Sequence, residues 1–206
     1  MRPRNFGVRV HNQEKATQGF TLFSPLWDQK TSLINMAGDV VHEWELPGTP
    51  GGYARLLPNG NLFYATTTEE GPPFKGGAGG GLIREVDWDN NVVMEYRDDW
   101  QHHDLRRLPN GNILYAGWEM MPEDAAKRVK GGIPGTELPE GIVNDFVKEV
   151  TPAGEIVWEW HAHSDMDIEK YELHPLCPRR VFAWCNTTFA LENGDVLISL
   201  RQINLV

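Results

Sequence analysis

The sequence predicts an all-β fold, a β-propeller of four-stranded blades, of which the 206 residues supply about three. Three observations lead to this prediction. Hairpin signals alternate along the chain, they recur with a period of about 50 residues, and 21 glycines with eight tryptophans are typical of short strands and tight turns. Because propellers close with roughly four to eight blades, about three blades are expected to be the front half of a longer propeller, or a half that pairs with another.

One series of hairpins carries Asn-Gly between apolar flanks. Its members are LPNGNLFY at 57–64, LPNGNILY at 108–115 and LENGDVLIS at 191–199. Asn and Gly both tolerate positive φ, so the motif predicts a two-residue type I′ turn.

A second series alternates with the first, and each member has a polar or glycine turn, two apolar residues and then an aromatic residue. Its members are 33–45, 83–97 and 147–160. Two hairpins in each repeat make one four-stranded sheet, the unit of a propeller blade. A sandwich or meander with coincidental spacing is the alternative.

The repeat spacing also locates two insertions in a single partial propeller domain, residues 1–206. Gly60 and Gly111 lie 51 positions apart, whereas the third copy is stretched, so insertions are predicted near 118–145 and 161–182. A helix is predicted over 122–130 in the first insertion, and a Gly/Pro-rich loop over 66–81. Unpaired blade faces would favour self-association.

Composition restricts the classes of partner. The net charge of −10 argues against nucleic-acid binding, and no apolar run is long enough to span a membrane or to act as a secretory signal. A cytoplasmic location without a cofactor is therefore the expectation. Cys177 and Cys185 are expected to be free thiols, with a disulfide left open.

The phrase QHHDLRRLPNGNILY places His102, His103 and Asp104 just before a hairpin turn. On an inner propeller strand they would lie at the mouth of the central channel. Neutral imidazole can accept a proton near pH 7, and Asp104 could orient it, which points to acid–base chemistry. The alternative is a polar pair satisfied by the backbone at the start of a strand.

Two further candidates are weighed against simpler explanations. His161 and His163 alternate in HAHSDMD, so both imidazoles could reach one metal ion, but no third ligand is evident and no metal is the favoured interpretation. Arg201 is predicted to lie on the strand after the third Asn-Gly turn, in LISLRQIN, where it could bind an oxyanion or simply face solvent.

Several phrases in order, GFTLFSP, LINMAGDVVHEWEL, HHDLRRLPNGNILYAGWE, VWEWHAH and LENGDVLISLRQIN, resemble the arylsulfotransferase family of bacterial β-propeller enzymes. The resemblance implies a six-bladed propeller that moves a sulfuryl group between phenols through a transiently sulfated channel histidine. It also implies a small phenolic or aryl sulfate ligand and no nucleotide donor. Relatives are often exported.

The resemblance assigns roles to individual residues. One of His102 and His103, with Asp104, matches the family's channel histidine motif, and Arg201 matches the arginine that holds sulfuryl oxygens. Trp184 in FAWCN stands where the family has a histidine. Its indole can stack on an aromatic ring but cannot shuttle a proton as a histidine does.

The family's nucleophilic histidine belongs to a blade beyond Val206, so this chain alone is expected to be inactive in transfer. A non-catalytic binding or scaffold propeller is the alternative function.

Overall fold

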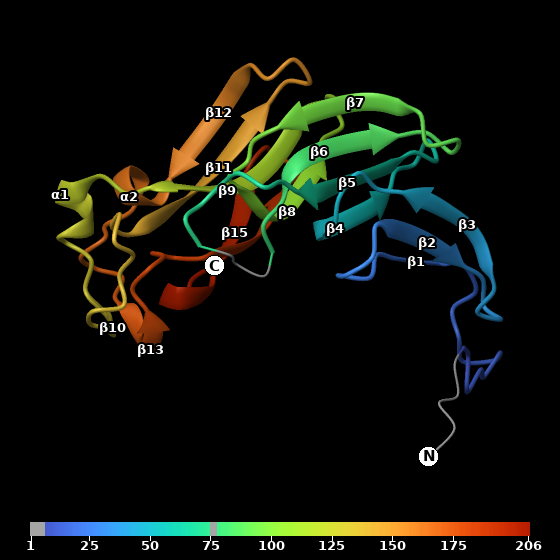
Figure 1. Cartoon of the computed structure of the whole chain (residues 1–206), viewed down its shortest axis with the longest axis horizontal. Coiled ribbons are helices and arrows are strands. Elements are labelled where there is room, and N and C mark those ends of the chain that lie inside the picture. The colour runs from blue at the N-terminus through green and yellow to red at the C-terminus, as the bar shows by residue number, and fades with distance from the viewer. Residues whose placement is uncertain (1–6, 75–77) are drawn as a thin grey trace.

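The computed structural model describes residues 7–74 and 78–206 and is built mainly of antiparallel strands (Figure 1). The all-β prediction is confirmed. The strands of the described residues form five sheets, and none of them closes on itself. No helix in this part of the chain is both long and apolar enough to cross a membrane.

Two four-stranded antiparallel sheets occupy the middle of the chain, and in each of them strands pair in the order in which the chain visits the sheet. The first sheet contains β4 (Pro50–Leu56), β5 (Leu62–Thr67), β6 (Gly81–Val86) and β7 (Val92–Arg97). The second sheet contains β8 (Gln101–Arg107), β9 (Ile113–Met120), β11 (Val143–Val150) and β12 (Ile156–His161).

Smaller sheets flank these two. A three-stranded sheet comes first, with β1 (Thr21–Phe23), β2 (Lys30–Ile34) and β3 (Val40–Glu45), and a two-stranded sheet comes last, with β14 (Cys185–Ala190) and β15 (Val196–Leu200). The described chain therefore has two complete four-stranded units where the repeat predicted about three. The first strands of successive sheets lie in contact, β1 with β4, β4 with β8 and β8 with β14.

All six predicted hairpins are present, but the predicted turn type is wrong. In the first LPNGN turn, Gly60 N donates to Leu57 O (2.9 Å) and Leu57 N donates to Asn61 O (2.8 Å). Gly60 has a φ of +89°, and Asn59 is not among the residues with positive φ. This is a three-residue loop, a type I turn followed by a left-handed glycine, and Pro58 suits the second position of a type I turn. The same pair of backbone bonds closes the other five turns.

Residues 121–142, between β9 and β11, and residues 162–184, between β12 and β14, pack against one another on one side of the molecule (Figure 1). Their elements are α1 (Glu123–Ala126), β10 (Gly131–Ile133), α2 (Ala162–Asp165) and β13 (Leu173–Pro178), and β10 pairs in parallel with β13. The predicted helix over 122–130 is reduced to the single turn of α1. Within the Gly/Pro-rich loop, residues 75–77 lie outside the described residues.

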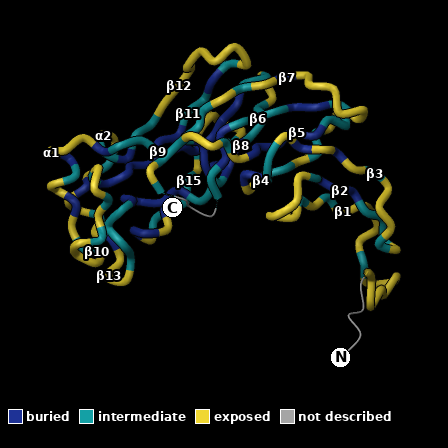
Figure 2. The backbone as a smooth tube through the Cα atoms, in the orientation of Figure 1, coloured by how far each residue is buried: buried dark blue, intermediate teal, exposed yellow. Residues whose placement is uncertain are grey.

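Buried residues are found along the strands of the two four-stranded sheets (Figure 2), and their side chains form clusters between successive sheets. Leu33 and Trp44 meet Leu62 between the first two sheets, and Phe63 and Ile83 belong with Tyr115 to the cluster between the two four-stranded sheets. The outer strands are different, because the apolar pairs of the second hairpin series are exposed there. Cys177 and Cys185 are both free thiols, and burial raises the pKa of Cys185.

Gly117 in β9 is a position where packing excludes any side chain. A Cβ there would lie 2.1 Å from Cζ of Phe146, whose ring rests on the glycine. We expect Gly117→Ala to lower the free energy of unfolding by about 1–3 kcal/mol, the usual cost of overpacking. Urea denaturation measures it, and adding Phe146→Leu should recover part of the loss. A Gly117→Ala protein as stable as the wild type would contradict this packing.

Candidate functional site

The two adjacent histidines lie on β8, at a break in its pairing with β9. The register shifts between His102 and Leu105, and His103 has a φ of +51°. Neighbouring side chains of a regular strand point to opposite faces, but this bulge brings the two Nδ1 atoms within 2.8 Å. His102 is fully buried and His103 is half-buried, so His103 is the more accessible imidazole.

Hydrogen-bond chemistry assigns the protons of this pair. Trp184 Nε1 lies 3.2 Å from His103 Nε2, and an indole N–H can only donate, so His103 Nε2 accepts. A neutral His103 then carries its proton on Nδ1 and donates to His102 Nδ1. The proton of His102 is left on Nε2, which lies 3.2 Å from Asp145 Oδ1, at ion-pair distance but without hydrogen-bond geometry. The hydrogen bonds therefore run from Trp184 through His103 to His102, and Asp145 faces the far nitrogen of His102 at ion-pair distance only.

Asp145 also holds the segment that carries Trp184. It is fully buried; its Oδ2 accepts from Trp184 N (2.7 Å) and its Oδ1 from Cys185 N (2.8 Å). Ala183 and Trp184 have φ values of +70° and +59°. Left-handed backbone costs about 1–3 kcal/mol at such residues and persists only where its surroundings enforce it. His103 is a third such residue, so strained backbone gathers at this one place.

Asp104 does not have the predicted role of orienting a histidine. Its Oδ1 accepts from Leu105 N (3.1 Å) and Arg106 Nη1 (2.8 Å), and its Oδ2 accepts from Thr187 Oγ1 (2.5 Å) and Thr188 N (2.9 Å). Asp104 therefore ties β8 to β14. The carboxylate that faces a histidine is Asp145, which the sequence did not single out.

Arg201 lies close to the histidines, though not on a strand as predicted. It is exposed and begins the short 3₁₀ helix η1 (Arg201–Ile203), just after β15. Its guanidinium carbon lies 5.1 Å from the centroid of a Trp184 ring. Trp184, predicted to stack on a ligand, is itself only 7% exposed and is covered on this side by Arg201.

A second arginine, Arg180, approaches the same tryptophan. Its guanidinium lies 5.9 Å from a Trp184 ring and 5.6 Å from Phe74. Within residues 7–74 and 78–206, neither Arg180 nor Arg201 has a carboxylate at ion-pair distance. Sequence reasoning missed Arg180; the Arg-Arg pair just before FAWCN was the available signal.

The electrostatics of His103 follow from this enclosure. Burial, together with the nearby His102 and Arg201, lowers the pKa of His103 to about 3. The imidazole is therefore neutral near pH 7, and its Nε2 lone pair is directed at the indole N–H.

A cavity of about 220 Å³ lies beside the cluster, and Phe74 and Trp118 line it. Trp118 stacks on His102 with centroids 3.9 Å apart and contacts Trp184 edge-on at 5.7 Å. Its Nε1–H is buried and meets no acceptor among the described residues. The surroundings of the histidines are thus rich in hydrogen-bond donors and aromatic faces.

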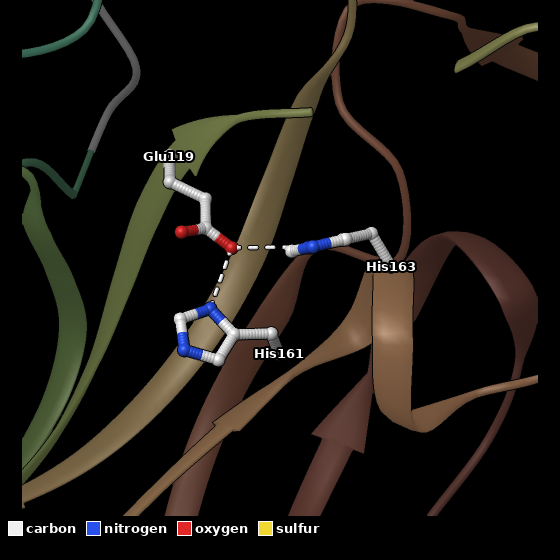
Figure 3. Close-up of side chains that lie close together, drawn as sticks. All are labelled: Glu119, His161 and His163. Atoms are coloured by element: carbon white, nitrogen blue, oxygen red, sulfur yellow. Dashed lines mark hydrogen bonds and ion pairs between the residues drawn. The ribbon is translucent and has the colours of Figure 1, made fainter. Parts of the chain in front are cut away.

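His161 and His163 belong to a separate cluster with Glu119 (Figure 3). Glu119 Oε1 lies 2.7 Å from Nδ1 of His161 and 3.3 Å from Nδ1 of His163. The carboxylate comes from β9, His161 ends β12 and His163 lies on α2. The structure therefore supplies the third ligand that the sequence lacked.

Comparison with known proteins leaves the family open. No family model matches the chain, and no curated protein matches it. Among solved structures, it is similar to a protein of unknown function from Bacteroides caccae, with 13% identity and a TM-score of 0.43, over 90% of this chain and 66% of that one.

Proposed function

We propose that this chain is part of an arylsulfotransferase-like β-propeller and binds a phenolic compound or its sulfate ester beside His103, Trp184 and Arg201. In this proposal it serves the transfer of a sulfuryl group between phenols. The resemblance of the ordered sequence phrases suggests the activity, and the geometry of the site supports it.

The sheet arrangement supports a propeller. Each complete unit is a four-stranded antiparallel meander, and the first strands β4, β8 and β14 are neighbours. Strands in these positions surround the axis of a propeller, which has four-stranded sheets as its blades. His103 and Trp184 lie on or next to two of these strands. In a closed ring they would face the central channel.

One observation carries the proposal, the pair of arginines at Trp184. In a chain of net charge −10, two guanidinium groups that meet no carboxylate among the described residues lie beside the same buried ring. The indole N–H of Trp118 also has no acceptor in the part of the chain that the structure describes. Planar guanidinium groups bind the oxygens of sulfate esters well, and the aromatic walls suit an aryl group.

His103 would carry the proton in this reaction. Nε2 of His103 would first give up its hydrogen bond from the Trp184 indole. As the oxygen of the acceptor phenol bonds to sulfur, its proton would then pass to Nε2 of His103 and the bond between sulfur and the leaving oxygen would break. That proton would return to the leaving oxygen. His102, which contacts His103 and faces the Asp145 carboxylate, would steady the imidazolium during transfer, as a buried carboxylate does in catalytic triads.

Phenyl sulfate binding tests this proposal. Calorimetric titration of the chain should show saturable binding that Arg201→Ala and Arg180→Ala each weaken about tenfold, equivalent to about 1.4 kcal/mol. Phenol, which lacks the sulfuryl oxygens, should bind the same way in the wild type and in both variants. Arg128 is exposed and lies just after α1, and it is not one of the two arginines at Trp184. Arg128→Ala is therefore the matched control. Equal affinity in the double arginine variant would refute the site.

A non-catalytic binding propeller is the second candidate. Trp184, at the position of the family's histidine, favours it because an indole neither takes up nor releases a proton near pH 7. In that case phenyl sulfate and phenol both bind with unchanged affinity to His103→Gln. Because this chain alone is expected to be inactive in transfer, binding distinguishes the two candidates: the enzyme requires the phenol hydroxyl to donate to His103, so His103→Gln should weaken phenol binding.

A further inference from the structure

We infer that Glu119, His161 and His163 form a binding site for one divalent transition-metal ion of the zinc class. The site is separate from the proposed aryl sulfate site. β9 and β11 pair so that Glu119 is opposite Asn144 and Trp118 is opposite Asp145. Because successive residues of a strand face opposite sides, the metal ligands and the His103 cluster lie on opposite faces of the same two strands.

The ligand atoms have nearly the required spacing. The three candidate ligand atoms lie within 4.8 Å of one another, and His163 Nδ1 is 3.3 Å from Glu119 Oε1. An ion with bonds of about 2.0–2.1 Å in tetrahedral geometry separates its ligands by about 3.3 Å. The shorter 2.7 Å contact between His161 and Glu119 is a hydrogen bond, which an ion would replace by taking the place of the proton.

His161 has the outer partner that metal-bound histidines have. Its Nδ1 faces Glu119 and its Nε2 lies 3.3 Å from Glu159 Oε2. A neutral imidazole carries one N–H and so satisfies only one of two carboxylates. An ion at Nδ1 leaves the N–H for Glu159, the carboxylate–histidine–metal arrangement that orients such ligands.

Asn144 contacts the other two ligands. It is fully buried, and its Nδ2 lies 2.9 Å from Glu119 Oε1 and 3.0 Å from His163 Nδ1. Because an amide N–H can only donate, His163 Nδ1 is the acceptor, and the proton of a neutral His163 is on Nε2. Nδ1 of His163 therefore has the lone pair that a metal ligand needs, and an ion would take the place of the amide hydrogen bond.

The donor set decides the class of ion. Two imidazoles and one carboxylate suit Zn²⁺ and neighbouring transition metals, whereas Ca²⁺ and Mg²⁺ prefer oxygen ligands. The side chains of Glu119, His161 and His163 are 28%, 19% and 23% exposed, so solvent can complete the coordination. A bound ion would also fasten α2 and the end of β12 to β9.

Zinc titration of the full chain tests the inference. After chelator treatment, calorimetry should show one equivalent of Zn²⁺ bound, and mass spectrometry of the native protein should show one ion. His163→Asn and Glu119→Gln should each weaken binding at least 100-fold, and Glu159→Gln by about 10- to 100-fold. His174→Asn and Cys177→Ser are the controls, because both residues lie outside the cluster and should leave the affinity unchanged.

Two further readouts separate a site from a plain ion pair. Zinc should raise the melting temperature of the wild type and not that of His163→Asn, and Co²⁺ should give a visible spectrum without thiolate bands. Near-ultraviolet circular dichroism confirms that each variant is folded. Failure of Zn²⁺ and Co²⁺ to bind, or equal binding by the Glu119→Gln/His163→Asn double variant, would overturn the inference. Neither result bears on phenyl sulfate binding.

Discussion

Replacing Asp145 with alanine is expected to lower the free energy of unfolding by about 3–5 kcal/mol. The change removes the carboxylate that accepts from the buried backbone N–H groups of Trp184 and Cys185, and leaves Trp184 N with Phe182 O (2.9 Å) as its acceptor. It also removes the contact that holds Ala183 and Trp184 in left-handed backbone, and the charge that faces His102. Urea denaturation followed by circular dichroism measures the loss.

Replacing Asp145 with asparagine keeps the shape of the side chain and removes its charge, so it tests the two contributions to stability separately. Asp145→Asn keeps one acceptor oxygen and should cost less than Asp145→Ala, while the fluorescence of the nearby tryptophans should change in both. Asp89→Ala alters an exposed carboxylate and should change stability by less than about 0.5 kcal/mol. A loss below 1 kcal/mol in Asp145→Ala would show that another group supports the strained segment.

The hairpins were predictable because their signals are local. Five residues such as LPNGN contain a complete turn, and the glycine is needed where φ is positive, as at Gly60. The type of turn was missed because Asn-Gly favours two geometries, and Pro58 selects the one with three loop residues. The side-chain amide of the second asparagine in the motif has a further role. Asn61 donates to Glu85 on β6, and Asn112 donates to Glu149 on β11.

The site was only partly predictable because its partners are distant in sequence. His103, Trp184 and Arg201 lie together in the structure, an arrangement that the sequence left open. Asp145 could not be singled out from the sequence because NDFVKEV is typical of an ordinary strand. The backbone groups that Asp145 binds lie about 40 positions away. Glu119 lies beside His161 and His163 because of how β9 aligns with β11. An insertion separates these two strands in the sequence, so the sequence does not define their alignment.

Acid is expected to destabilise the protein through His103. Burial, with His102 and Arg201, holds the pKa of His103 at about 3 in the folded chain, against about 6.5 in the unfolded chain. Below pH 6.5 the unfolded chain binds a proton that the folded chain does not. The free energy of unfolding should therefore fall by about 1.4 kcal/mol per pH unit, or about 2–3 kcal/mol from pH 6.5 to 4.5.

The window from pH 6.5 to 4.5 isolates this effect, since most carboxyl groups titrate below it. His103→Gln should remove about that slope, whereas His174→Gln, at an exposed position, should leave it unchanged. An equal slope in wild type and His103→Gln would show that His103 is charged in the folded protein.

The same measurement connects the histidine to the proposed ligand. Arg201 is one of the groups that lower the pKa of His103, so an anion bound to Arg201 should raise that pKa. Saturating phenyl sulfate should then make the stability of the wild type less dependent on pH between 6.5 and 4.5. In Arg201→Ala the ligand should have a smaller effect. Phenyl sulfate that binds without changing the slope would place the anion away from His103 and favour the non-catalytic binding module.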